Sequence, residues 1–83
     1  MDKCYVVTAY DEYGYQFVLG VYDHPSIAVR DGEEFLNEWF DRNDPNMRLD
    51  IPSYVVYRLT QDGTYEKAAW FDIQKIPMNV RVR

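Results

Sequence analysis

The segment SIAVRDGEEFLNEWFDR, residues 26–42, decides the fold class, because its apolar residues recur with the period of a helix. At about 100° per residue, they fall on one arc of roughly 140°, and the opposite side is polar. The members of this arc are Ala28, Val29, Gly32, Phe35, Leu36, Trp39 and Phe40. Asp23 can cap such a helix, and Pro25 is tolerated in its first turn. We therefore expect one amphipathic helix, with Gly32 marking a close approach to a sheet.

Strand-like runs lie on both sides of this helix and are rich in β-branched and aromatic residues. They cover residues 4–10, 16–22, 51–60 and 65–73. A short glycine-containing turn joins the first two runs, and Asp62-Gly63 between the last two is typical of a type I′ hairpin. Residues 47–50 read as a loop. The sequence predicts an α+β fold of order ββαββ, with a four-stranded antiparallel sheet and one helix packed on one face.

The simplest arrangement places the third strand beside the first, which gives the strand order 2-1-3-4. We expect a single domain over residues 1–74, which hold 6 basic and 14 acidic residues. Residues 75–83 hold three basic residues and no acidic one. We interpret them as a basic C-terminal tail, which could pair as a short edge strand because Val80-Arg81-Val82-Arg83 alternates.

The composition excludes several classes of protein. One Cys and one His are too few for an intramolecular disulfide or for a Cys/His zinc site. The formal net charge of −5 disfavours direct nucleic-acid binding. No nucleophile or phosphate-binding motif is present, Cys4 reads as an apolar filler, and His24 reads as a solvated or capping residue. We therefore expect no enzymatic activity, no catalytic residues, no cofactor and no metal ion.

The compartment is indicated by the ends and by the cysteine usage. The first residues do not resemble a signal peptide, and no run approaches the roughly 18 apolar residues that cross a bilayer. A lone cysteine suits a reducing environment. We expect a cytoplasmic protein that does not interact with membranes.

Four acidic residues follow one another at helical spacings of three and four: Asp31, Glu34, Glu38 and Asp41. These offsets place their carboxylates within an arc of about 80° on the outward side of the helix. Such an acidic stripe is common on an ordinary solvated helix face. It also suits docking on a basic surface, because aligned carboxylates attract basic groups over a long range. We treat the stripe as a candidate site for a protein partner with a basic surface.

The aromatic residues form the second candidate interface, since the chain has eight Tyr, four Phe and two Trp. Alternation along the strands leaves large aromatic side chains on the sheet face away from the helix: Tyr10, Tyr22, Tyr54 and Trp70. This aromatic face could be covered by the tail, or its tyrosines could lie flat with their hydroxyls in water. Alternatively, the face binds a partner or a second copy.

The N-terminal part of the chain carries a family resemblance. Tyr5-Val6-Val7-Thr8 and Gly20-Val21-Tyr22-Asp23, followed by a helix with Ala28, resemble small uncharacterised proteins of bacteriophages and mobile elements. The match covers the first third of the chain, and its motifs are structural. The resemblance implies a ββα core and, for a phage protein, location in the host cytoplasm. Short acidic phage proteins often inhibit host or host-defence proteins.

Two functional hypotheses follow. The first is a non-enzymatic acidic binding protein, a phage-encoded inhibitor of a host or host-defence protein that acts through the acidic stripe. The alternative is a structural or accessory module that homo-oligomerises, for example as a homodimer, through the aromatic face.

Overall fold

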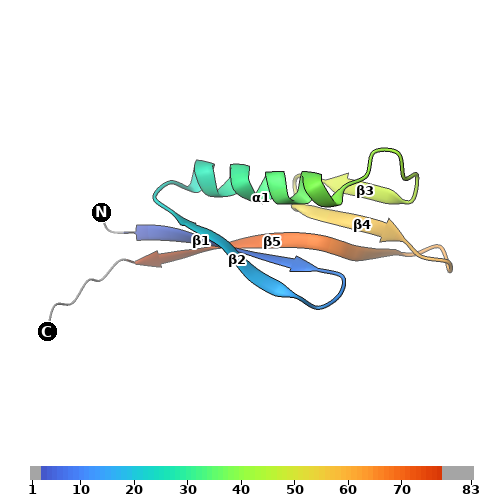
Figure 1. Cartoon of the computed structure of the whole chain (residues 1–83), viewed down its shortest axis with the longest axis horizontal. Coiled ribbons are helices and arrows are strands. Elements are labelled where there is room, and N and C mark those ends of the chain that lie inside the picture. Colours follow the sequence, from blue (N-terminus) through green and yellow to red (C-terminus); the bar gives the residue numbers. More distant parts are fainter. Residues whose placement is uncertain (1–2, 78–83) are drawn as a thin grey trace, which may run out of the picture.

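The computed structural model describes residues 3–77 as one helix on one face of an antiparallel sheet (Figure 1). The elements are β1 (Lys3–Asp11), β2 (Gln16–Tyr22), α1 (Pro25–Trp39), β3 (Met47–Asp50), β4 (Val55–Leu59) and β5 (Tyr65–Pro77). The five strands lie in the order β2-β1-β5-β4-β3. The predicted α+β class, with one helix and an antiparallel sheet, is confirmed.

The sheet has five strands where the sequence predicted four. Residues 47–50, expected to be a loop, form β3, and the strand expected over residues 51–60 begins only at Val55. The cause is Tyr54, whose φ of 57° lies in the left-handed region that a strand does not contain. Its backbone N–H donates to the carbonyl of Ile51, which closes the turn between β3 and β4.

The predicted order 2-1-3-4 is also wrong, because β5 and not the preceding strand lies beside β1. Strand β5 is 13 residues long and pairs with β1 along the whole length of β1 while also pairing with β4. It continues to Pro77, three residues past the boundary expected at residue 74. The rest of the expected tail, residues 78–83, lies outside the described residues.

Both hairpins form, but the second does not have the expected type I′ turn. A type I′ turn needs positive φ at both central residues, whereas Gly63 alone has one, at +87°. Its N–H donates to the Thr60 carbonyl, and the Thr60 N–H donates to the Thr64 carbonyl. This pattern is a type I turn followed by a glycine bulge. Gly14 has the same φ of +87° in the β1–β2 loop.

Helix α1 begins at Pro25, with His24 as its N-cap residue, and ends at Trp39, three residues earlier than expected. Just beyond this end, Asp41 Oδ1 accepts a 2.9 Å hydrogen bond from the Asn43 N–H. This local bond competes with the backbone hydrogen bonds that would continue the helix. Within residues 3–77, no helix is long and apolar enough to cross a membrane.

The core lies between α1 and the sheet face that it covers. Val7, Leu36 and Val56 are the largest fully buried side chains. The close approach expected at Gly32 is present, since a methyl group there would collide with the Phe71 ring. No helix formed by residues 3–77 lies on the other sheet face (Figure 1).

Candidate functional site

A groove of about 390 Å³ lies between α1 and β2. We call it the α1–β2 groove. It is lined by Phe17, Leu19 and Tyr22 of β2 and by Asp31, Glu34, Phe35, Glu38 and Trp39 of α1. Within the part of the chain that the structure describes, strand β2 pairs with β1 on one side and is an edge of the sheet on the other. The groove therefore combines a helix flank with a free strand edge.

One wall of this groove is apolar and partly solvated. Phe17 is 42% exposed, and its ring meets Phe35 edge-on with centroids 5.6 Å apart. Leu19, the extra residue of a β-bulge against β1, is half-buried beside them. Trp39 lines the end near the β1–β2 loop, where its ring lies 6.3 Å from that of Tyr13. These rings offer apolar contact area that the fold itself leaves incompletely covered.

The other wall is acidic. Asp31 is half-buried, and its Oδ1 lies 3.8 Å from Nε of Arg30. Burial, together with neighbouring Asp31 and the charge of Glu34, raises the pKa of the Tyr22 hydroxyl above its ordinary value. Glu34 and Glu38 are exposed, and neither makes an ion pair with another of residues 3–77. Two carboxylates are thus free to meet a cation brought by a ligand.

The structure brings together three of the four residues predicted to form the acidic stripe. Asp31, Glu34 and Glu38 lie on the flank of α1 that borders the groove, not on an isolated outward face. Asp41 is beyond the end of the helix, in the turn that its own side chain stabilises. The stripe is therefore shorter than expected and adjoins an apolar wall.

An ion pair anchors the loop at the end of the groove. Arg58 of β4 binds Glu12 through two hydrogen bonds of 3.1 Å each, and its Nη1 lies 3.8 Å from Oδ2 of Asp44. The hydrogen bonds to Glu12 raise the pKa of Arg58 above its already high ordinary value. This bidentate pair ties the β1–β2 loop, which carries Tyr13, to the far half of the sheet.

The residues predicted to form the aromatic face are divided between the two sides of the sheet. Tyr10 and Trp70 stack on the open side, with centroids 5.3 Å apart, and the Tyr10 hydroxyl donates to Asp72. Tyr22 lines the α1–β2 groove. Tyr54 packs on the helix side, against Phe71, with centroids 5.0 Å apart. Only Tyr10 and Trp70 remain as members of the expected surface.

Other residues extend this pair into a band across the open face. Lys67 Nζ lies 5.3 Å from the centre of the Trp70 ring, and the guanidinium of Arg48 lies 5.7 Å from that of Tyr65. Tyr57 contacts Tyr65 with centroids 6.5 Å apart. Neither tyrosine was predicted to lie on this face. Tyr65 reaches it because a β-bulge at Ala68 interrupts the alternation of β5, and no sequence signal marked that bulge. Strand β4 alternates without interruption, and its own alternation places Tyr57 there.

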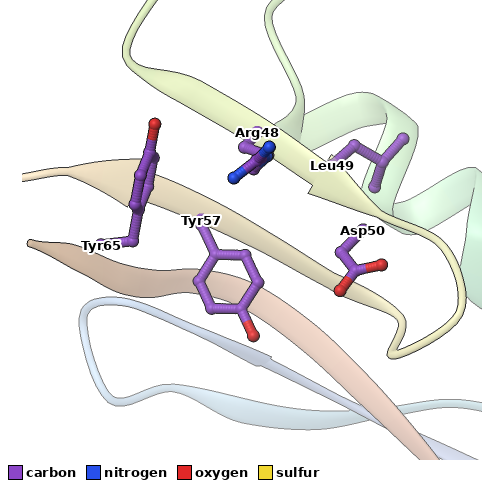
Figure 2. Close-up of a pocket in the computed structure, with 5 residues that line it drawn as sticks. All are labelled: Arg48, Leu49, Asp50, Tyr57 and Tyr65. Carbon is purple, nitrogen blue, oxygen red and sulfur yellow. The ribbon is translucent and has the colours of Figure 1, made fainter.

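Figure 2 shows a second pocket, of about 410 Å³, at one end of this band. It is lined by Arg48, Leu49, Asp50, Tyr57 and Tyr65. Arg48 is engaged with Tyr65, and Asp50 Oδ2 accepts a 2.6 Å hydrogen bond from the Ser53 hydroxyl. One cation and one anion face this pocket, and both already have partners. The charges of this pocket therefore favour no class of ligand as clearly as the charges of the α1–β2 groove do.

Residues with reactive or metal-binding chemistry are dispersed. Among residues 3–77, no group of three His, Cys, Asp or Glu side chains is placed to hold a metal ion. Cys4 is buried, and His24 is exposed at the start of α1. Comparisons with protein-family models, with curated proteins and with solved structures found no match to this chain.

Proposed function

We propose that this protein is a non-enzymatic binding protein that accepts a basic segment of another protein in the α1–β2 groove. One observation carries the proposal. Glu34 and Glu38, without ion-pair partners among residues 3–77, border an apolar wall on which Phe17 remains 42% exposed. The long apolar stems of lysine and arginine suit such a wall, while their charged ends reach carboxylates at its rim.

The overall charge supports the same class of partner. The whole chain has a net charge of −5, so its field attracts basic surfaces and speeds encounter with them. A basic segment held in the groove is withdrawn from any acidic ligand that it would otherwise bind. Inhibition of a host or host-defence protein by this competition is the role that we propose if the gene belongs to a phage.

The test uses a fluorescein-labelled nonapeptide in which lysine alternates with valine. The variant Glu34→Lys/Glu38→Lys should bind this peptide at least about tenfold more weakly than the wild type does, which corresponds to about 1.4 kcal/mol. Glu33→Lys/Glu66→Lys is the matched control, because it changes the net charge equally but outside the groove. Binding of the wild type should also weaken as ionic strength rises from about 0.1 to 1 M, where the Debye length shortens from about 10 to 3 Å.

Equal binding by the wild type and by Glu34→Lys/Glu38→Lys would refute the groove as the binding site. Equal weakening in both double variants would mean that net charge alone drives binding. Circular dichroism of each variant establishes that the fold is intact.

A second candidate function is homodimerisation through the open face. It is favoured by the Tyr10–Trp70 stack and by balanced charge, since Arg48 and Lys67 share this side with Asp50 and Asp72. Two copies could therefore face each other without net repulsion. Sedimentation equilibrium at micromolar concentration should show a dimer that Trp70→Lys dissociates, and a strict wild-type monomer with intact sheet structure would eliminate this candidate.

A further inference from the structure

We propose that the basic partner segment binds as an additional β-strand along the free edge of β2. Its basic side chains would point toward α1, and its apolar side chains would point toward the open face. This inference rests on the proposed function and specifies the conformation and residue pattern of the partner. Three features of β2 and its surroundings carry it.

The first feature is the edge itself. Strand β2 has seven residues, Gln16–Tyr22, and contains no charged residue and no proline. Charges and prolines are common means by which edge strands avoid pairing with another chain. A bulge at Leu19 increases the local twist, but uncharged side chains flank it on both sides. No strand within residues 3–77 pairs with the outer side of β2, so its outward backbone groups are available for strand addition.

The second feature is the acidic flank above this edge. Asp31, Glu34 and Glu38 are separated by about 4.5 and 6 Å along the helix axis. Alternate residues of a strand are about 6.7 Å apart and point to the same side. Flexible lysine or arginine side chains at two or three alternate positions can therefore reach successive carboxylates. This charge complementarity selects a partner strand that is basic on its helix side.

The third feature is the opposite side of β2. Val18 and Val21 are 59% and 62% exposed, and they pair in register with Thr8 and Val6 of the open face. An added strand would place its other alternate side chains beside these two valines. Apolar side chains there would gain cross-strand contacts with them. The expected partner motif therefore alternates basic and apolar residues.

Backbone methylation of the labelled lysine–valine nonapeptide tests strand addition separately from electrostatic attraction. N-methyl groups on alternate residues remove the N–H donors from one edge of the peptide and leave its charges unchanged. Two peptides, one methylated on the lysines and one on the valines, block opposite edges. Because β2 pairs with only one edge of an added strand, we expect one methylated peptide to bind within about twofold of the parent peptide. The other should lose about tenfold or more.

Equal affinities of the two methylated peptides, whether both retained or both lost, would overturn strand addition. If both are retained and Glu34→Lys/Glu38→Lys still abolishes binding, the proposed function stands while this inference fails. If the unmethylated peptide binds the charge-reversed variant normally, the proposed function itself fails.

The chain's own basic residues could compete for the same edge, and the variant Arg81→Glu/Arg83→Glu addresses this. We expect this variant to bind the peptide within about threefold of the wild type, because the occupant that we propose is a foreign segment. Binding more than about tenfold tighter would assign the edge to the protein's own C-terminal residues and would overturn the proposal of a foreign partner.

Discussion

The two edges of the sheet differ in length, charge and surroundings. Strand β3 has four residues, and two of them, Arg48 and Asp50, are charged. Strand β2 has seven residues, none of them charged, and it borders the acidic flank of α1. A short charged edge discourages pairing with another chain, whereas a longer uncharged one permits it. The difference indicates that charged side chains protect the β3 edge, whereas the β2 edge has a bulge at Leu19 but no charged residue of its own, so that a basic partner can bind beside the acidic flank of α1.

The largest expected effect on stability comes from weakening the packing of α1 against the sheet, beside the β2 edge. Leu36 is fully buried between α1 and the sheet, so Leu36→Ala should lower the free energy of unfolding by about 2–5 kcal/mol. Leu49→Ala, which truncates a half-buried side chain beside the β3 edge, is the matched control and should cost less. Urea unfolding followed by circular dichroism measures both. Equal losses would show that the two edges depend equally on core packing.

A smaller effect is expected where the helix approaches the sheet most closely. Gly32→Ala should lower the free energy of unfolding by about 1–3 kcal/mol, because the added methyl group collides with the Phe71 ring. Asn37→Ala, at an exposed position of α1, should be neutral or slightly stabilising. Thermal unfolding compares the two variants. A Gly32→Ala protein as stable as the wild type would mean that the helix shifts away from β5 at little cost.

The smallest effect concerns the pH dependence of the groove. The pKa of Tyr22 is raised in the folded protein, so the folded state retains the phenolic proton over a range in which the unfolded chain releases it. This contribution to stability is complete below about pH 10 and is lost as the pH rises through the folded-state pKa. Urea unfolding between pH 9 and 11 should therefore show a steeper loss of stability for the wild type than for Tyr22→Phe. Parallel losses in the two proteins would contradict this role of Tyr22.

Much of the fold was predictable because its signals are local. The helical period of residues 26–42 and the glycine-containing turns predicted α1 and both hairpins. The order 2-1-3-4 also placed the second strand at an edge, as β2 is. The strand order was missed because the pairing of β1 with β5 joins distant parts of the chain. Other missed features depend on single backbone geometries that composition does not reveal. They include the left-handed Tyr54, which divides β3 from β4, and the bulge that places Tyr65 on the open face.

The candidate site was predictable only in part, for a related reason. Helical spacing correctly grouped Asp31, Glu34 and Glu38, but Asp41 was lost because its side chain stabilises a turn. The apolar wall was not predicted from the sequence. An edge strand beside a single helix leaves residues such as Phe17 and Leu19 partly uncovered. Combining the predicted edge position with the predicted stripe would have indicated the α1–β2 groove.

The pairing of β1 with β5 has a consequence for how the chain folds. The central ladder joins residues 3–11 to residues 69–77, so its contacts span nearly the whole described sequence. During synthesis, the first hairpin and α1 emerge while their main partner strand is still missing. Long-range pairing of this kind slows folding, and an uncharged β2 edge would be exposed to other chains during that interval. The edge proposed to bind a partner is thus also the place where a nascent copy is most vulnerable to mispairing.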